Sequence, residues 1–327
     1  QLLHRAKERE RFSFSFRSEN ILYPTRSIPF VRSSCIIHLN SGNTKMNNNK
    51  IAEYISSHSV KAVENINTET KDVKYSSSIK SPRQINKLPG NEELVRAIVL
   101  TKLSNEYGYK LENLEIEKTY NIGRPKVINP RIDLIVKDDK GNAFLYIELK
   151  SPEEFEKDQD EIIEKQLFNL AGAELALGNS VKYLVLMTCE LSKDTFPYKS
   201  IVIDYEKYHS FEEWKKERHY ADEIPKKYGF AIKTPYVKSG CKDLEKTYSK
   251  EQIDSIRRNL HNVLWGGGGT DDNEVFSSLV NLILAKIQDE SEKCDGEKYD
   301  FQSFSFIDES GEKFETNEDL FKGSSKN

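Results

Sequence analysis

The sequence lacks any long hydrophobic run, and this absence excludes a membrane-spanning helix. Such a helix needs about 18–20 consecutive apolar residues. None occurs in this chain of 327 residues, of which 37% are hydrophobic and 31% are charged. The basic segment 1–11 is not followed by an apolar block, so we do not expect a secretory signal. We therefore expect a cytoplasmic protein with no membrane partner.

Cysteine is scarce, and its spacing argues against two common kinds of site. The four cysteines lie far apart, no C-x-x-C pair occurs, and the six histidines do not cluster with them. A zinc site or a disulfide framework is therefore not expected, and free thiols are the better interpretation. The four residues are Cys35, Cys189, Cys241 and Cys294.

The chain also lacks the motifs of a nucleotide-driven motor. The glycines at 266–269 are not followed by the lysine of G-x-x-x-x-G-K-[ST], and no predicted strand leads into them. A glycine hinge between two helices explains them without a nucleotide. The formal net charge of −4 neither supports nor excludes DNA binding, because a local basic face matters more than the sum.

Composition divides the chain into five segments. The first methionine is Met46, where we expect translation to start, and residues 66–90 are rich in Ser, Asn, Thr and Lys, which is typical of a linker. The expected segments are a disordered N-terminal segment and linker (1–90), a folded domain (91–205), an irregular extension or linker (206–248), a helical region (249–290) and an acidic mobile tail (291–327).

Hydrophobic periodicity within 91–205 predicts an α/β fold. Leu94, Val95 and Ile98 recur at helical spacing after Asn91, which we expect to cap the helix. Alternating or continuous apolar runs then predict strands. The predicted order is a helix from 91, strands at 114–120, 131–136 and 143–150, a helix at 155–177, and strands at 181–188 and 199–205. This order is typical of a mixed sheet flanked by helices.

Three charged residues interrupt two apolar strands near their ends. On the strand 143–150, Glu148 and Lys150 share one face, because side chains alternate along a strand. Asp133 interrupts the preceding strand in the same way, and the hairpin that joins the two strands can bring it beside Glu148. Charges that alternate on a solvated sheet face are the ordinary alternative interpretation.

Two carboxylates and an amine that lie together could perform phosphodiester hydrolysis. Mg²⁺ takes oxygen ligands from one or two carboxylates and keeps several waters, so Asp133 and Glu148 are the predicted metal ligands. The backbone carbonyl of Leu149 is a further candidate. The expected ion is Mg²⁺, for which Mn²⁺ can substitute. Such an ion polarises the phosphate and acidifies a bound water, and Lys150 could orient that water or stabilise charge on the phosphate.

Asp133 with Glu148-Leu149-Lys150 resembles the P-D-(D/E)-x-K nuclease signature, and residues 91–190 resemble the N-terminal nuclease domain of type I restriction enzyme R subunits. Four segments carry this resemblance: Asn91–Arg96 resembles P-E-E-x-x-R, Arg131–Asp133 resembles R-x-D, Ile147–Lys150 resembles I-E-x-K, and Gln166 stands where the family has the glutamine of Q-x-x-x-Y. Asn91 replaces the usual proline, and Leu170 stands in place of the tyrosine.

The resemblance implies a restriction-endonuclease-like mixed sheet flanked by helices, and a metal-dependent DNA endonuclease activity. It adds Gln166 to the catalytic residues Asp133, Glu148 and Lys150, and it adds Glu92 to the metal ligands. A charge in the first turn of a helix is an equally good explanation of Glu92.

A second resemblance concerns residues 262–290, which look like the start of the helical region that precedes the catalytic domain of adenine DNA methyltransferases in restriction–modification systems. No Asn/Asp-Pro-Pro-Tyr/Phe tetrapeptide is present, so we do not expect methylation by this chain alone. We expect a partial α-helical region after the nuclease-like domain.

The function expected from the sequence is that of a metal-dependent endonuclease module of a restriction–modification system. Its expected partners are double-stranded DNA, a methyltransferase or specificity subunit, and a second copy in a transient dimer on DNA. Basic residues near the core are candidate DNA contacts, namely Arg124, Lys126 and Arg131. The alternative is a non-catalytic nucleic-acid-binding or assembly module of a restriction–modification complex.

Overall fold

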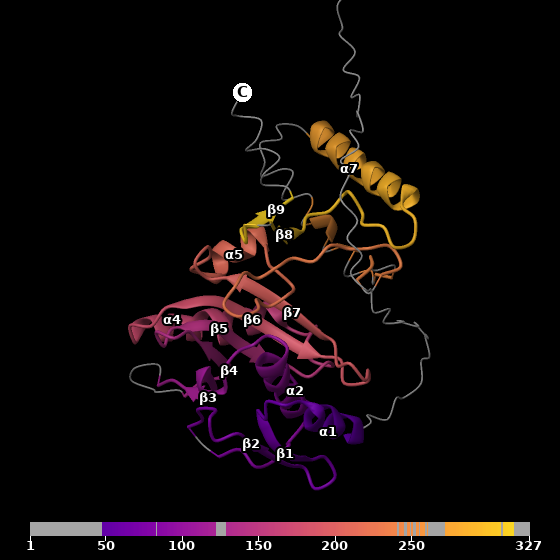
Figure 1. Ribbon diagram of the computed structural model, residues 1–327. Helices are drawn as coiled ribbons and strands as arrows, with labels where there is room; N and C mark the ends of the chain where they lie inside the picture. Colours follow the sequence, from indigo (N-terminus) through magenta and orange to yellow (C-terminus); the bar gives the residue numbers. More distant parts are fainter. Residues whose placement is uncertain are drawn as a thin grey trace, which may run out of the picture. The chain divides into compact units, whose positions relative to one another are not determined.

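The fold is built around a five-stranded mixed sheet in the order β3-β4-β5-β6-β7 (Figure 1). The computed structural model describes residues 48–82, 84–121, 129–240, 242–244, 247–248, 250, 253–254, 256–258, 260, 272–308 and 310–316. The strands are β3 (Leu114–Thr119), β4 (Arg131–Lys137), β5 (Ala143–Leu149), β6 (Val181–Cys189) and β7 (Tyr198–Asp204). Strands β5 and β6 run parallel, and the other neighbours run antiparallel. The predicted α/β fold is confirmed, and every strand end lies within one residue of its predicted position.

Helix α2 (Asn91–Asn105) packs on one face of the sheet, where Leu145 and Ile147 of β5 lie in the same core as Val95 and Ile98 of the helix. Asn91 is not the N-cap: Gly90 holds that position without a side-chain hydrogen bond, and the Asn91 amide donates to Glu153 at 3.2 Å.

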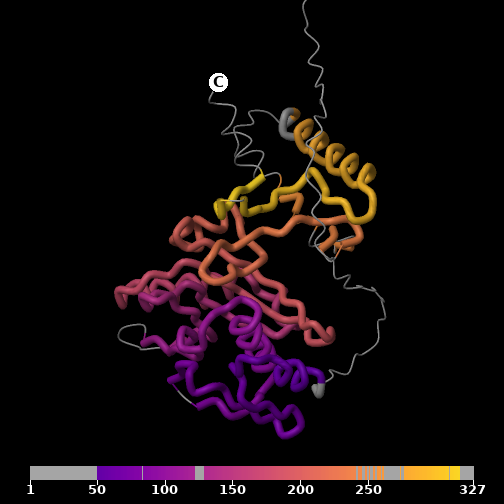
Figure 2. Tube along the Cα trace, in the orientation of Figure 1, coloured from indigo at the N-terminus to yellow at the C-terminus, as the bar shows by residue number. Residues whose placement is uncertain are grey.

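Residues 48–82 are not a disordered segment and linker, so this part of the sequence-based prediction is wrong. They form α1 (Asn48–Ser57), β1 (Val63–Asn67) and β2 (Asp72–Tyr75), the indigo part of Figure 2. The elements are short, and most of their residues are polar. They fold because a few spaced apolar side chains are buried in the core that α2 forms: Ile51, Ile55, Val63, Val73 and Ile79.

The opposite face of the sheet is covered by one continuous helical stretch. It consists of α3 (Gln159–Ile162), a π-helical turn η2 (Ile163–Phe168) and α4 (Asn169–Ala176). The helix was predicted from residue 155 but begins at Gln159, because residues 152–158 form turns and bends. Helix α5 (Phe211–Glu217) joins the same core through Phe211 and Trp214.

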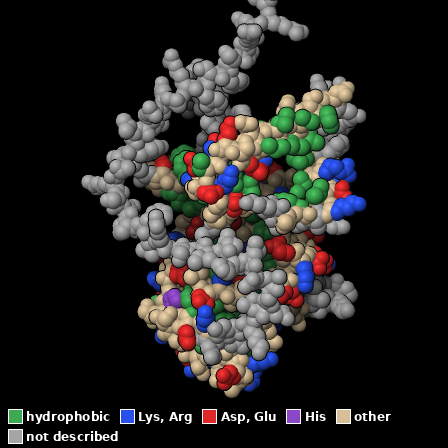
Figure 3. All heavy atoms as spheres, turned by 90° about the vertical axis from the view of Figure 1, so that its right-hand side faces the viewer, with side chains coloured by type: hydrophobic (Ala, Val, Ile, Leu, Met, Phe, Trp, Pro, Cys, Tyr) green, Lys and Arg blue, Asp and Glu red, His purple; other side chains and the backbone are tan. Residues whose placement is uncertain are grey.

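The described C-terminal residues, 272–308 and 310–316, are more ordered than the sequence predicts. The helical region predicted at 249–290 overlaps α7 (Asp272–Glu292), which carries exposed apolar side chains such as Phe276 and Ile287. Figure 3 shows hydrophobic side chains on the surface of the molecule. The predicted mobile tail contains a hairpin of β8 (Ser305–Ile307) and β9 (Lys313–Glu315). Hydrogen bonds hold this region, including one of 2.8 Å from the Ser305 amide to the Lys233 carbonyl. In the described residues, no helix is both long and apolar enough to cross a membrane.

The carboxylate of Asp289 ties α7 to the segment before β8, and we expect this link to weaken in acid. It accepts hydrogen bonds from the backbone amides of Asp300 at 2.8 Å and Phe301 at 2.9 Å. Burial alone would raise the pKa of Asp289, but these two amides outweigh burial and hold the pKa below its ordinary value of 3.8. The link should therefore stabilise the fold fully above pH 3.8 and be lost as the pH falls through the lower folded-state pKa.

An NMR titration of the Asp289 carboxyl group would check this expectation. The amide resonances of Asp300 and Phe301 should shift over the same pH range as the carboxyl group titrates. Asp289→Asn should abolish these pH-dependent shifts. A carboxyl group that titrates at or above its ordinary value would contradict the proposed cause.

Candidate active site

Asp133 of β4 and Glu148 of β5 lie together and are buried in the hairpin that these two strands form. Each is 5% exposed. Leu134 pairs with Ile147 across the two strands, so the next position along the hairpin sets Asp133 opposite Glu148. The backbone amide of Leu149 donates to Asp133 Oδ2 at 2.9 Å. The strand register thus explains why two residues that are 15 positions apart in the sequence meet.

Lys150 follows the last residue of β5 and completes the predicted group of three. Its Nζ donates to Glu148 Oε1 at 2.5 Å and lies 4.0 Å from Glu92 Oε2 at the start of α2. The other oxygen of Glu148, Oε2, is buried and has no hydrogen-bond partner among the described residues. A buried carboxylate oxygen without a partner is costly, so Glu148 Oε2 is an acceptor that a cation or a hydrogen-bond donor would satisfy.

Burial and an excess of negative charge together shift the pKa values at this site. Burial and the nearby Asp133 raise the pKa of Glu148 well above its ordinary value, although Lys150 opposes this rise. Burial and Asp133 also raise the pKa of Glu92. Burial alone would lower the pKa of Lys150, but the Glu148 carboxylate outweighs burial and raises it. A cation bound between the carboxylates would relieve this excess.

Sequence analysis missed Arg96 as part of this site. The guanidinium is 2% exposed and contacts three carboxylates: Nη1 lies 2.5 Å from Glu93, and Nη2 lies 2.8 Å from Glu117 and 2.7 Å from Asp133. In the sequence, Glu93 and Arg96 stand out as charged residues among the apolar residues of the predicted helix. Charges with i,i+3 spacing usually lie on an exposed face, which hid their role.

Glu117 reaches Arg96 only because its backbone is left-handed, with φ of 59°. In a regular strand, Glu117 would point away from the face that carries Ile116. Here both residues lie on the α2 side, and Lys118 turns to the opposite side, where it binds Glu174 of α4. A non-glycine residue in this conformation costs about 1–3 kcal/mol and is often found at functional sites. No sequence pattern predicted it.

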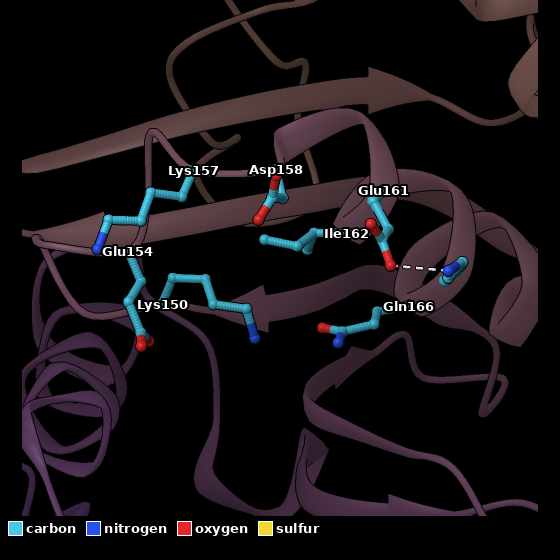
Figure 4. Close-up of a pocket in the computed structure, with 8 residues that line it drawn as sticks. Lys150, Glu154, Lys157, Asp158, Glu161, Ile162 and Gln166 are labelled. Carbon is cyan, nitrogen blue, oxygen red and sulfur yellow. Dashed lines mark hydrogen bonds and ion pairs between the residues drawn. The ribbon is translucent and has the colours of Figure 1, made fainter.

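Gln166 of η2 lies across a pocket of about 310 Å³ from Lys150 (Figure 4). Its Oε1 is buried and has no hydrogen-bond partner within the described part of the chain. The pocket contains as many lysines as carboxylates, so it is not a basic groove. The other lining residues are Glu154, Lys157, Asp158, Glu161, Ile162 and Lys165.

The structure describes one of the three residues predicted to contact DNA, and the contact itself stays a prediction. Arg131 is half-exposed, and its Nε donates to the buried Glu117 carboxylate at 2.9 Å, so it belongs to the Arg96 cluster. Arg124 and Lys126 lie outside the described residues.

The residues at the site fit a magnesium ion. Within the described ranges, no group of three or more His, Cys, Asp and Glu side chains has metal-binding geometry. Magnesium does not need three such side chains, because it keeps several waters beside one or two carboxylates. An ionised carboxylate offers about four acceptor positions, and Arg96 and Leu149 use two of those on Asp133. Asp133 therefore keeps acceptor capacity next to the unpartnered oxygen of Glu148.

The α/β sheet thus places two acidic residues and a lysine together at the end of a hairpin. Residues 91–201 match the family described as type I restriction enzyme R protein N terminus, a match that covers about a third of the chain. No curated protein matches the chain. The family match agrees with the resemblance of residues 91–190 and supports a role in a restriction system. It does not extend to residues 249–290, so no comparison supports their methyltransferase resemblance.

Proposed function

We propose that this chain carries a Mg²⁺-dependent endonuclease module of a restriction system, which hydrolyses phosphodiester bonds of double-stranded DNA. The observation that carries the proposal is the unpartnered, buried Oε2 of Glu148 beside Asp133 and Lys150. The family match of residues 91–201 supports the restriction-system role.

Each residue of the site has a distinct proposed role. Asp133 and Glu148 hold the ion, with the Leu149 carbonyl as a further ligand and Glu92 near enough to act through a bound water. The bound ion would acidify a water and withdraw charge from the phosphate. Lys150 orients that water and donates to the phosphate oxygens as charge develops on them. Gln166 faces the same pocket and is proposed to contact the DNA.

One observation favours the second candidate, a non-catalytic nucleic-acid-binding or assembly module. Both oxygens of Asp133 already accept hydrogen bonds, from Arg96 and from the Leu149 amide. If these bonds took all the capacity of the carboxylate, the fold would persist with an inactive site. A cleavage assay separates the two candidates.

Purified protein should nick or cleave plasmid DNA in Mg²⁺ or Mn²⁺ but not in EDTA, and Glu148→Gln should abolish the cleavage. Glu154→Gln, which changes a carboxylate in the same pocket but outside the proposed site, is the matched control and should keep full activity. Cleavage that survives EDTA or Glu148→Gln would contradict the proposal. DNA binding without cleavage under all metal conditions would favour the non-catalytic module.

The proposed partners follow from the same role. A duplex is cut on both strands when two such sites act together, so we propose a transient dimer on DNA. We also propose that a methyltransferase or specificity subunit directs the site.

A further inference from the structure

Arg96 lies at the centre of a buried cluster of three carboxylates. It is almost fully buried, and its guanidinium lies within 2.8 Å of the carboxylates of Glu93, Glu117 and Asp133. Each carboxylate is also bound from its far side, which fixes its position. Tyr75 donates to Glu93 at 2.5 Å, Arg131 to Glu117 at 2.9 Å, and the Leu149 amide to Asp133 at 2.9 Å.

The count of charges in the site matches a single divalent ion. Five carboxylates and three cationic side chains meet there, which leaves a formal excess of two negative charges when all are ionised. One Mg²⁺ would neutralise this excess, and two would leave an equal excess of positive charge in a buried site. Such a charge is strongly disfavoured. The residues are Glu92, Glu93, Glu117, Asp133 and Glu148 with Arg96, Arg131 and Lys150.

We propose that Arg96 is a positioning residue that serves as a permanent internal cation, so that the site binds one divalent ion and not two. This inference rests on the proposed nuclease function. The guanidinium is always protonated in proteins and offers several donors in a fixed plane. It therefore neutralises Glu93 and Glu117 and holds Asp133 by one oxygen, and the single ion binds on the side of Glu148 Oε2.

The left-handed backbone at Glu117 supports this role. A strained residue persists only when its surroundings hold it, and here the conformation turns the Glu117 carboxylate toward Arg96. A simple packing role for Arg96 would not require a second strand to distort in order to supply a carboxylate.

Mn²⁺ titration followed by the electron paramagnetic resonance of the free ion tests the inference, because it counts bound ions without requiring activity. The full chain should bind one Mn²⁺, and Arg96→Lys, which keeps one positive charge, should also bind one. Arg96→Met should bind two, because Glu93, Glu117 and Asp133 are then left without their cation. Glu117→Gln keeps Arg96, and Arg131, which loses its partner, is half-exposed, so the variant should fold. It should still bind one ion, but more weakly, because the site then carries one negative charge fewer.

The outcomes separate the inference from the function on which it rests. Two ions bound to the unmodified chain would overturn the internal-cation role and leave the nuclease proposal standing. A folded Arg96→Met that binds one ion, as the unmodified chain does, would also overturn only the internal-cation role. If Arg96→Met does not fold, the unmodified chain and Glu117→Gln still decide, because a loss of Mn²⁺ binding in Glu117→Gln would show that Glu117 is needed to hold the ion and would overturn the inference. No binding to the unmodified chain, or unchanged binding to Glu148→Gln, would overturn both proposals.

Discussion

Replacing Lys150 with alanine should lower the rate of metal-dependent DNA cleavage by at least about 100-fold, the usual effect of removing one donor that stabilises charge in a transition state. The amine is held against Glu148 Oε1 at 2.5 Å and faces the pocket that also contains Gln166. It is therefore positioned between the proposed metal ligand and the space where a phosphate would enter. The rate is measured as plasmid nicking at saturating Mg²⁺.

Lys165→Ala is the matched control for this substitution. Lys165 lines the same pocket, but its side chain is 63% exposed and pairs with Glu161 on the helix surface. Its loss should change the rate by less than about twofold, because exposed ion pairs contribute little. Lys150→Ala should still bind Mn²⁺, since Asp133 and Glu148 remain. Cleavage by Lys150→Ala at the unmodified rate would show that the lysine has no part in the chemistry.

Replacing Lys118 with methionine should destabilise the fold by about 3–5 kcal/mol, because it leaves a buried carboxylate without its cation. Glu174 of α4 is completely buried and accepts from Lys118 Nζ at 2.5 Å, from the Tyr120 hydroxyl and from Asn179 at 2.8 Å. Burial alone would raise the pKa of Glu174, but these donors outweigh burial and lower it. The pair joins β3 to α4 across the end of the sheet.

The double variant Lys118→Met with Glu174→Leu is the control for this prediction. It replaces both charges with apolar groups of similar size and should recover part of the lost stability. The recovery is partial because the buried Tyr120 hydroxyl loses its acceptor. Urea unfolding at neutral pH gives the free energies of unfolding of the unmodified chain, of each single variant and of the double variant, which together form a double-mutant cycle. A loss below about 1 kcal/mol in Lys118→Met, the range of exposed ion pairs, would show that the contact is a weak surface pair.

The sheet could be predicted from sequence because each strand shows its own local pattern. Val181 to Thr188 is apolar throughout, as expected for a strand covered on both faces. The hairpin turn after Lys137 makes β4 and β5 neighbours, so the sequence could predict that Asp133, Glu148 and Lys150 lie close together. A register shift between Val136 and Lys137, which no sequence pattern predicted, sets the exact pairing. These features depend on residues that are close in the sequence.

The parts that were missed depend on contacts between distant segments. β1 and β2 have few apolar residues, and they are stable because α2, from another part of the chain, covers them. The link from Asp289 to Asp300 and Phe301 orders a stretch that composition alone describes as a polar tail. Arg96 was seen only as part of a family motif, because its role requires the left-handed turn at Glu117.

The central claim is that Asp133 and Glu148 hold a divalent ion, and anomalous diffraction from crystals grown with Mn²⁺ tests it most directly. A single anomalous peak is predicted about 2 Å from oxygens of both carboxylates, where it would give Glu148 Oε2 its missing partner. A map with no peak at this position, at a Mn²⁺ concentration that saturates binding in solution, would contradict the account.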